Sequence, residues 1–374
     1  MLVLVTLIKK VTTCGSQPNN LKNMKKTALI LTILSLIFIQ SCDLVDSISG
    51  KKDDNTVKLY PVEIDGRWGY INSNGQLQIE PDFQWASLFQ EGLAVVRESN
   101  RWKYIDKTGE VVIEGNFSSI RNFSQGKAAV RFDGRWGYIN TSGNFVINPK
   151  FRDAHKFSNG RAFVRSLHNW GYYYIDEKGD KIESVDLPGS FDFVETNEFR
   201  DGLALVRDDD EFGYIDKSGN AAIKFKYNEA RPFSEKLAAV KISDKWGFIN
   251  SSEDVEISPQ FISAGDFGNG LAPARKNSNQ FGYVNRSGTL IIPEQFEIAE
   301  PFQEERAAVF VDGKWTFIDT SGNQITSPKF DEVDPFFNGL AKVTILIPSE
   351  MDDEFTEKVG YINKSGSYVW FPTN

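Results

Sequence analysis

Hydrophobic and polar residues alternate in short runs through most of the chain, a pattern that predicts β-strands. Two such runs, residues 127–131 and 135–140, are separated by a turn containing Asp133-Gly134. Asp-Gly accepts the positive φ angles of a tight hairpin turn, so we expect the two runs to pair antiparallel. Trp136 and Tyr138 then share one face of the second strand. Gly137 lies on the other face, where a strand glycine indicates that other atoms approach closely.

This aromatic hairpin recurs along the chain. The opening aromatic residues of the copies are Trp68, Trp102, Trp136, Trp170, Phe212, Trp246, Phe281 and Trp315, and a degenerate ninth copy begins at Val359. Most copies are 34 residues apart, with longer steps before Phe212 and before Val359. A fixed period of this kind indicates a tandem repeat array of about nine units.

A four-residue turn follows each hairpin, as in Asn140-Thr141-Ser142-Gly143. The Asn or Asp at its first position can accept a hydrogen bond from the backbone two residues later, and glycine supplies a left-handed conformation. Asp and Asn exchange freely between copies, which favours a turn over a metal site or a general base. The sixth copy has Glu253 in place of the glycine, and we expect its turn to be the loosest.

A third strand and a connector complete each unit. In the third copy the strand covers residues 145–147, Pro149 ends it, and Phe151, Ala154 and Phe157 follow at spacings of three. This spacing fits neither a strand nor an α-helix, so we expect a short 3₁₀-like or irregular connector. The fold class is therefore all-β, with units of about 34 residues and three strands that must stack on their neighbours to bury their faces.

Two arrangements of the units remain open. We favour an open or superhelical β-solenoid, because a β-propeller blade usually needs about 40–45 residues. A closed β-propeller is the alternative, because residues 56–63 and 367–371 at the two ends are both strand-like.

The first 56 residues lack the repeat. Residues 1–23 read as an upstream extension, because Met24-Lys25-Lys26 and the apolar residues 27–39 form the start of a signal peptide covering residues 24–41. The apolar run is too short to cross a bilayer comfortably. Residues 42–56 form a polar tether, and residues 57–374 hold the repeat array. Translation from Met1 and translation from Met24 both remain open.

Ile39-Gln40-Ser41-Cys42 resembles the bacterial lipobox. This resemblance implies that Cys42 is the lipid attachment site and that the mature protein is anchored to a membrane of the cell envelope, at the outer membrane or cell surface. A plain secretory signal is the alternative. The leaflet remains open.

The repeated Trp-Gly-Tyr-Ile-Asx motif, with its later glycine turn and Phe-x-x-Gly-x-Ala segment, resembles the bacterial WG-repeat family across about residues 57–374. The hairpin at residues 245–250 is also similar to those of choline-binding cell-wall repeats. The resemblance implies an architecture and no assigned chemistry.

Charge and composition exclude several functions. The formal net charge is −9, and no basic run stands out, which argues against nucleic acid as a partner. The two histidines, His155 and His168, have no cysteine or carboxylate at ligand spacing, so we expect no metal site and no cofactor. A nucleophile elbow, Gly-x-Ser-x-Gly, is also missing from the sequence.

The candidate contact residues break the repeat. They are the acidic residues Asp208, Asp209, Asp210, Asp352 and Asp353, and the additional aromatics Tyr172 and Tyr173. Inserts at residues 180–192 and 345–357 are further candidates, because solenoids often place binding surfaces on insertions. Trp85 and Trp370 are also additional to the repeat pattern and free to face a ligand.

From these observations we expect a non-enzymatic, envelope-anchored protein that binds or scaffolds a protein or cell-wall glycan. The alternative is a glycosidase-like hydrolase with loop carboxylates gathered on one face. An enzyme requires unique polar residues that converge, whereas a scaffold offers an extended surface.

Overall fold

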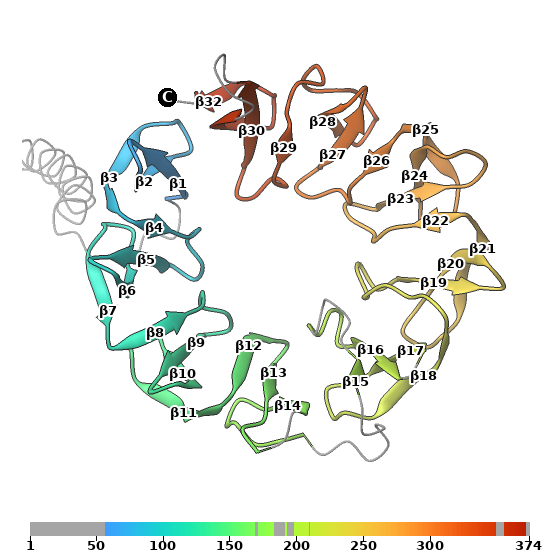
Figure 1. Cartoon of the computed structure of the whole chain (residues 1–374). Helices are drawn as coiled ribbons and strands as arrows, with labels where there is room; N and C mark the ends of the chain where they lie inside the picture. The colour runs from blue at the N-terminus through green and yellow to red at the C-terminus, as the bar shows by residue number, and fades with distance from the viewer. Residues whose placement is uncertain are drawn as a thin grey trace, which may run out of the picture. The chain divides into compact units, whose positions relative to one another are not determined.

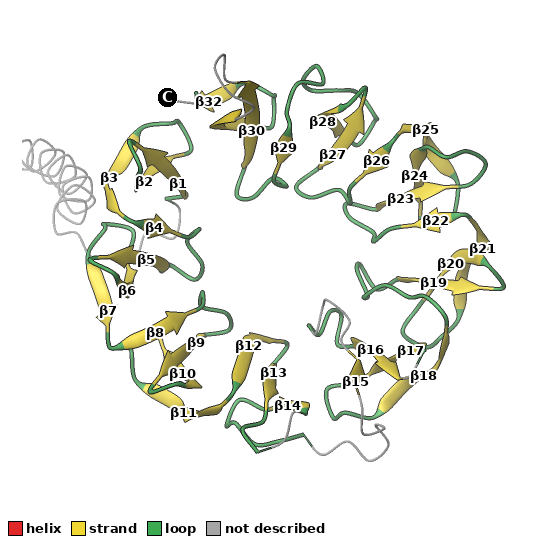
Figure 2. Cartoon of the chain, in the orientation of Figure 1, coloured by secondary structure: helices red, strands yellow, loops and turns green. Residues whose placement is uncertain are grey.

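The computed structural model describes residues 57–168, 171–182, 191–192, 198–208, 210–348 and 355–371, with only the backbone at 191–192. The chain divides into two units, Met1–Asp54 and Asn55–Asn374, and all the described residues belong to the second. These residues form strands and turns without a helix (Figure 2). The expected all-β repeat array is confirmed.

The strands form nine small antiparallel sheets, called sheets 1 to 9 in chain order. Sheet 1 contains β1 (Leu59–Ile64), β2 (Arg67–Asn72) and β3 (Leu77–Phe83), and sheet 2 contains β4 (Trp85–Ala86), β5 (Ala94–Glu98), β6 (Arg101–Ile105) and β7 (Val111–Glu114). Sheet 3 contains β8 (Phe117–Ile120), β9 (Lys127–Phe132), β10 (Arg135–Asn140) and β11 (Phe145–Phe151). Sheet 4 contains β12 (Asp153–Ser158), β13 (Arg161–Arg165) and β14 (Tyr172–Ile175).

Sheets 5 to 9 are also built from strands consecutive in the chain. Sheet 5 contains β15 (Phe191–Asp192), β16 (Ala204–Asp208), β17 (Glu211–Ile215) and β18 (Ala221–Tyr227), sheet 6 contains β19 (Ala238–Ile242), β20 (Lys245–Ile249) and β21 (Val255–Phe261), and sheet 7 contains β22 (Ser263–Ala264), β23 (Leu271–Arg275), β24 (Phe281–Asn285) and β25 (Leu290–Phe296). Sheet 8 contains β26 (Ile298–Ala299), β27 (Arg306–Val311) and β28 (Lys314–Asp319), and sheet 9 contains β29 (Glu332–Val333), β30 (Leu340–Pro348), β31 (Phe355–Asn363) and β32 (Tyr368–Trp370).

The expectation of a 3₁₀-like connector is wrong. Phe151 ends the last strand of sheet 3, and after one bent residue Ala154 lies in the first strand of sheet 4. An irregularity in the pairing with β13 separates Ala154 from Phe157. The spacing of three therefore arises from a bend followed by a bulge in extended chain. The connector adds a fourth strand to five of the nine described sheets, and in sheets 4 and 8 it provides the first of three strands. The expected set of three strands is therefore found in sheets 1 and 6 of the described residues.

The glycine of the aromatic motif has the expected close neighbour. A Cβ at Gly137 would lie 2.6 Å from the Ile147 carbonyl oxygen and 2.7 Å from the Pro149 nitrogen. The cause is a bulge in β11, because Trp136 pairs with Phe151 while Tyr138 pairs with Ile147. Sheet 2 has Lys103 at the equivalent position and pairs it directly with Glu114, without that bulge. Glycine is thus present where the third strand bulges over it.

The Asx turns also form as expected, with one exception. The amide of Ser142 donates to Asn140 Oδ1 at 3.1 Å, and the amide of Gly143 donates to the Asn140 carbonyl at 2.9 Å. The turn at Glu253 was expected to be loose, but its amide donates to the Asn250 carbonyl at 3.0 Å. Glu253 takes a φ of 69° and forms an ion pair with Lys226 of the preceding sheet. That ion pair anchors the turn.

Neighbouring sheets bury hydrophobic clusters between them. One cluster joins Tyr138 of sheet 3 to Val164 and Ile175 of sheet 4, and similar clusters lie at the other junctions. A repeated hydrogen bond reinforces these junctions. The tyrosine hydroxyl of one sheet donates to a carbonyl 17 residues later, in Tyr70–Ser87, Tyr104–Arg121, Tyr138–His155, Tyr214–Arg231 and Tyr283–Glu300, at 2.6–2.8 Å.

Sheet 9 lies beside sheet 1 in Figure 1, and comparable contacts join the two sheets. Tyr60 and Val62 share a hydrophobic cluster with Leu340 and Tyr361, and the Tyr361 hydroxyl donates to the Pro61 carbonyl at 2.8 Å. The rings of Tyr60 and Tyr361 lie 5.7 Å apart. The sheets of the described unit therefore form a ring, which corrects the preference for an open array and supports the propeller-like alternative.

The fourth copy begins at a different residue from the one that the sequence indicates. Tyr172 pairs with Arg165, as Trp102 pairs with Arg97 in sheet 2. Tyr172 thus occupies the position of the opening aromatic, and Trp170 lies outside the described residues. The added residues between the strands shift the motif along the chain.

Candidate binding groove

A polar groove of about 390 Å³ runs along the connectors of consecutive sheets. It is lined by Gln90, Arg121, Asn122, Phe123, Ser124, His155, Lys156 and Glu198. Most of these residues lie in the connector, between its small apolar residue and its second phenylalanine or directly after that phenylalanine. The phenylalanines and the small residue are nearly constant between copies, whereas the two residues between them vary widely.

The repeat scaffold fixes the backbone of the groove. The carbonyl of Arg121 accepts a hydrogen bond from Tyr104 at 2.7 Å, and the carbonyl of His155 accepts one from Tyr138 at 2.7 Å. Both tyrosines are fully buried. The variable side chains therefore project from a backbone that buried groups hold in place.

Opposite charges are paired along the groove. Arg121 Nη2 lies 3.1 Å from Asp153 Oδ1, and its guanidinium lies 5.0 Å from the centre of the Trp136 ring. Lys156 Nζ lies 2.9 Å from Glu198 Oε1. Because these side chains are 30–52% exposed, each pair contributes modestly to stability and both charges remain accessible to a ligand.

His155 faces the same cluster. Its Nε2 lies 3.7 Å from Asp153 Oδ2, and its ring lies 5.8 Å from the ring of Phe163. Burial lowers the pKa of His155 below its ordinary value, and the positive charge of Arg121 lowers it further, while Asp153 and Glu198 oppose the shift. The imidazole is therefore neutral near pH 7 and offers one donor and one acceptor.

A second ionic contact between connector residues lies farther around the ring. Arg200 Nη1 lies 3.5 Å from Asp266 Oδ2, and Asp266 again precedes the second phenylalanine of its connector. Burial raises the pKa of Asp266, although Arg231 and Arg200 lower it in part. The Oδ1 atom of Asp266 is buried and accepts no hydrogen bond from a described residue. This carboxylate is therefore incompletely neutralised.

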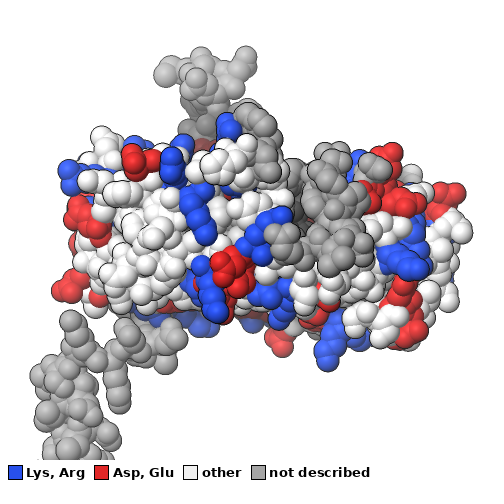
Figure 3. All heavy atoms as spheres, turned by 90° about the horizontal axis from the view of Figure 1, so that it is seen from below, with Lys and Arg blue, Asp and Glu red and all other residues white. Residues whose placement is uncertain are grey.

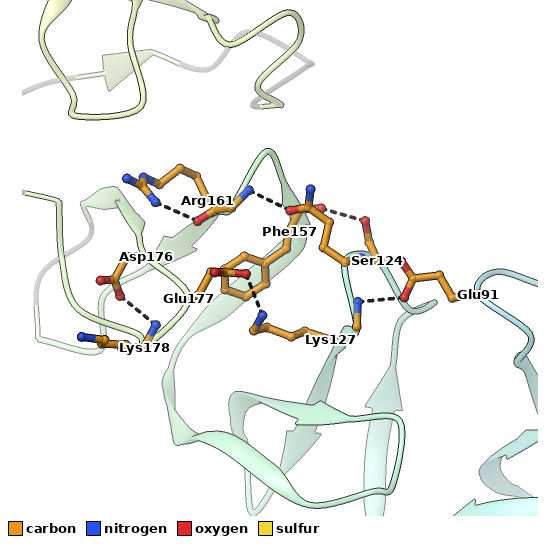
Figure 4. Close-up of polar contacts among 11 residues, drawn as sticks. Glu91, Ser124, Lys127, Phe157, Arg161, Asp176, Glu177 and Lys178 are labelled. Carbon is orange, nitrogen blue, oxygen red and sulfur yellow. Dashed lines mark hydrogen bonds and ion pairs between the residues drawn. The ribbon is translucent and has the colours of Figure 1, made fainter.

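The turns beside the groove link one sheet to the next (Figure 4). Glu91 accepts hydrogen bonds from the amides of Gln125 at 2.6 Å and Gly126 at 2.8 Å, and the Gln125 side chain accepts one from the amide of Gly160 at 2.7 Å. Lys127 Nζ lies 3.0 Å from Glu177 Oε1. These bonds join three consecutive sheets beside the groove.

The candidate aromatics Tyr172 and Tyr173 are half-buried. Tyr172 stacks on Phe163 with ring centres 5.1 Å apart, and the Arg165 guanidinium lies 5.1 Å from its ring. Tyr173 packs edge-on against Phe151 and borders the cluster between sheets 3 and 4. Both residues belong to sheet 4, outside the residues that line the polar groove. Trp85 is 42% exposed and lies beside Trp102, also away from the groove.

The candidate acidic residues are described only in part. Asp208 and Asp210 flank the turn between β16 and β17, where Asp210 forms an exposed ion pair with Arg207 at 3.1 Å. Asp209, Asp352 and Asp353 lie outside the described residues, as do Cys42 and much of both inserts. The structure therefore does not place the two acidic runs relative to each other.

The sequence prediction missed Arg121, His155, Lys156 and Glu198 as a group. A signal was present, because charged residues replace one another between two constant positions of the connector. Treating the connector as a structural spacer concealed this signal. The extended connectors of neighbouring sheets bring these variable positions together.

Figure 3 shows basic and acidic side chains interspersed on the face seen from below. No group of three or more His, Cys, Asp or Glu side chains in this part of the chain is arranged to hold a metal ion. No described segment forms a helix with the length and hydrophobicity of a membrane span.

Comparisons with known proteins identify the repeat. The family described as "WG containing repeat" matches residues 68–102, 104–136, 136–167, 212–246, 246–279, 281–315 and 315–345, which together make up more than half of the chain. No curated protein matches.

Solved structures show a more distant similarity. A structure titled as a eukaryotic initiation factor is 9% identical, with 83% of this chain and 95% of that chain covered and a TM-score of 0.53. The dihydro-heme d1 dehydrogenase NirN is 10% identical, with coverages of 87% and 75% and a TM-score of 0.40. Hsv2 of Kluyveromyces lactis is 7% identical, with coverages of 82% and 95% and a TM-score of 0.31. The first likeness concerns the fold alone.

Proposed function

Because the chain belongs to the family of WG containing repeats, we propose that it is a non-enzymatic scaffold of the cell envelope that binds protein or cell-wall glycan through the polar groove. The observation that carries this proposal is the grouping of Arg121, His155, Lys156 and Glu198 on a constant framework. A repeat protein that varies only selected surface positions keeps its fold while changing its ligand.

The chemistry of the groove favours a polar ligand of mixed charge. Arg121 and Lys156 provide cations, Asp153 and Glu198 provide carboxylates, and neutral His155 provides a donor and an acceptor. Peptides and the peptide-bearing glycans of the cell wall both carry ammonium and carboxylate groups. Among these two classes we favour protein, because the groove is lined by charged groups and a single aromatic, Phe123.

The lipid anchor is part of the proposal. The lipobox-like residues 39–42 support attachment at Cys42, which brings the array to the envelope, at the outer membrane or cell surface. Labelling cells with a radioactive fatty acid tests this step. We expect label and membrane pelleting in the wild-type protein and their loss in Cys42→Ala. Unlabelled wild-type protein in the soluble fraction contradicts the anchor.

The binding function is tested in cells by photo-crosslinking. A photoreactive amino acid at Gln90, beside the groove, should give a discrete adduct that the double substitution Arg121→Glu and Lys156→Glu abolishes. Lys178→Glu changes an exposed cation of the turn after β14 and serves as the matched control. An adduct that is unchanged by the double substitution contradicts binding at the groove.

The source of the ligand is tested separately. Purified cell-wall sacculi are sedimented with the full-length protein, with and without the double substitution. Co-sedimentation that depends on Arg121 and Lys156 assigns a glycan ligand. Its absence together with a protein adduct in the crosslinking experiment assigns a protein ligand.

A further inference from the structure

The first strand of sheet 1 is missing from the described residues. In most other sheets a small apolar residue of the connector pairs with the next strand, as Ala86 pairs with Val96 and Ala154 with Val164. Val62 occupies the equivalent position in β1, because it pairs with Gly69 as Val130 pairs with Gly137. On its other side β1 has no described strand partner. An open strand edge of this kind is a template for an added strand.

Sheet 2 shows which backbone groups such a strand uses. There the amides of Gln84 and Ser87 donate to the carbonyls of Arg97 and Val95 at 2.7 and 2.9 Å. The equivalent residues in sheet 1 are Glu63 and Pro61. Pro61 has no amide hydrogen, and Tyr361 already donates to its carbonyl. The backbone of Glu63 therefore remains as the point of attachment.

A groove of about 360 Å³ lies along this edge, between sheet 1 and sheet 9. We call it the seam groove. Val62, Trp68 and Trp370 provide apolar surface in it. Its other lining residues include four acids, namely Glu63, Asp65, Glu332 and Glu357. One cation, Lys342, also lines the groove and lies 3.1 Å from Asp334.

Glu63 reverses the charge found elsewhere in the ring. Six other sheets carry a cation at this position, namely Arg97, Arg131, Arg165, Arg207, Lys241 and Arg275. In three of these sheets the residue opposite is acidic: Arg165 pairs with Asp153, Arg207 pairs with Asp192, and Lys241 forms an ion pair with Glu229. In the other three the residue opposite is Trp85, Ser119 or Ser263. Opposite charges across a strand pair attract, so Glu63 favours a cation on the strand opposite.

We propose that the seam groove binds an extended basic peptide of another protein, which adds to β1 as the first strand of sheet 1. The peptide places Lys or Arg opposite Glu63 and a following Ala, Val or Ile opposite Val62. Backbone hydrogen bonds to Glu63 provide affinity, and the acidic rim selects basic sequences. This site is separate from the polar groove, so either can fail without the other.

The chain's own preceding residues fit this position poorly. In the other repeat units a fixed spacing links the connector to the strand that follows it. The small apolar residue of the connector lies eight positions before the first buried alanine of that strand, as Ala86 does before Ala94. The same spacing, counted back from Tyr60, reaches Lys52. A lysine there lacks the apolar side chain that the core requires, which favours an occupant from another protein.

The test uses two fluorescein-labelled peptides and the purified full-length protein. Both peptides carry the sequence of residues 261–267, one with Ser263→Lys and the other with Ser263→Glu. Fluorescence anisotropy at low salt should show the lysine peptide binding about tenfold more tightly than the glutamate peptide. The protein variant Glu63→Lys should reverse this preference. Glu110→Lys, an exposed acid of sheet 2, should leave it unchanged.

Three results overturn the proposal. One is the absence of peptide binding, as expected if the chain's own leading residues fill the edge. Another is a preference that survives Glu63→Lys. The last is a dimeric protein that Glu63→Lys converts to a monomer, because a second copy then occupies the groove.

Discussion

The residue type at a repeat position depends on the backbone that packs directly against it. Gly137 is required because the bulge in β11 brings the Ile147 carbonyl over it, whereas sheet 2 lacks a bulge at this position and accepts Lys103. The sequence shows the exchange of glycine for other residues but not the bulge that explains it. The residue type at this repeat position therefore reflects whether the neighbouring strand has a bulge.

Gly137→Ala should destabilise the protein by about 1–3 kcal/mol, because the new methyl group overlaps the backbone of β11. Chemical denaturation measures this change in the free energy of unfolding. Lys103→Ala, at the equivalent position of sheet 2, should cost less than about 1 kcal/mol, since its partly exposed ion pairs contribute little. Equal losses in both variants would argue against the bulge as the cause.

His155 should make stability depend on pH. Burial lowers its pKa from the ordinary value of 6.5, so the unfolded chain binds a proton at a higher pH than the folded protein does. The contribution of neutral His155 is therefore complete above pH 6.5 and is lost as the pH falls below that value. His155→Gln removes this loss. The melting temperature of the variant should rise relative to that of the wild type between pH 7.5 and pH 5. A difference in melting temperature that does not change with pH would contradict the role assigned to His155.

At the scale of the strand and turn, the sequence predicted much of the structure. The Asp133-Gly134 hairpin and the Asx turns form as expected because their signals are local, residing in residues that tolerate unusual backbone angles. The connector was predicted wrongly because its spacing of three combines a bend with a bulge, and neither has a local sequence signature. The groove residues Arg121 and Lys156 were missed for the same reason, because their proximity depends on that connector.

The tyrosine hydrogen bonds between sheets add to the packing of the aromatic rings in the copies that carry tyrosine. Tyr138→Phe removes the donor to the buried carbonyl of His155 and should cost about 1–3 kcal/mol. The ring itself fits either residue, because Phe248 and Phe317 occupy this position in other sheets. Tyr173→Phe is a suitable control, since half-buried Tyr173 packs against Phe151 through its ring. Denaturation midpoints should separate the two variants, and an unchanged midpoint for Tyr138→Phe would contradict the role of the bond.

At the scale of the described repeat array, the arrangement of the sheets forms both proposed binding grooves. Neighbouring sheets bring variable connector residues together along the polar groove, and closure of the ring forms the seam groove between sheet 9 and sheet 1. An open array was the preferred expectation because the copies are short. Closure could not be inferred from the repeat itself, since it depends on the contact of Tyr60 with Tyr361, which lie at opposite ends of the described array.

The coupling between Tyr60 and Tyr361 tests closure most directly. A double-mutant cycle with Tyr60→Leu and Tyr361→Leu measures the interaction free energy between the first and last sheets. Ring contact at 5.7 Å predicts a coupling of about 0.5–3 kcal/mol. Additive effects of the two substitutions would mean that the terminal sheets do not touch, and would contradict the ring.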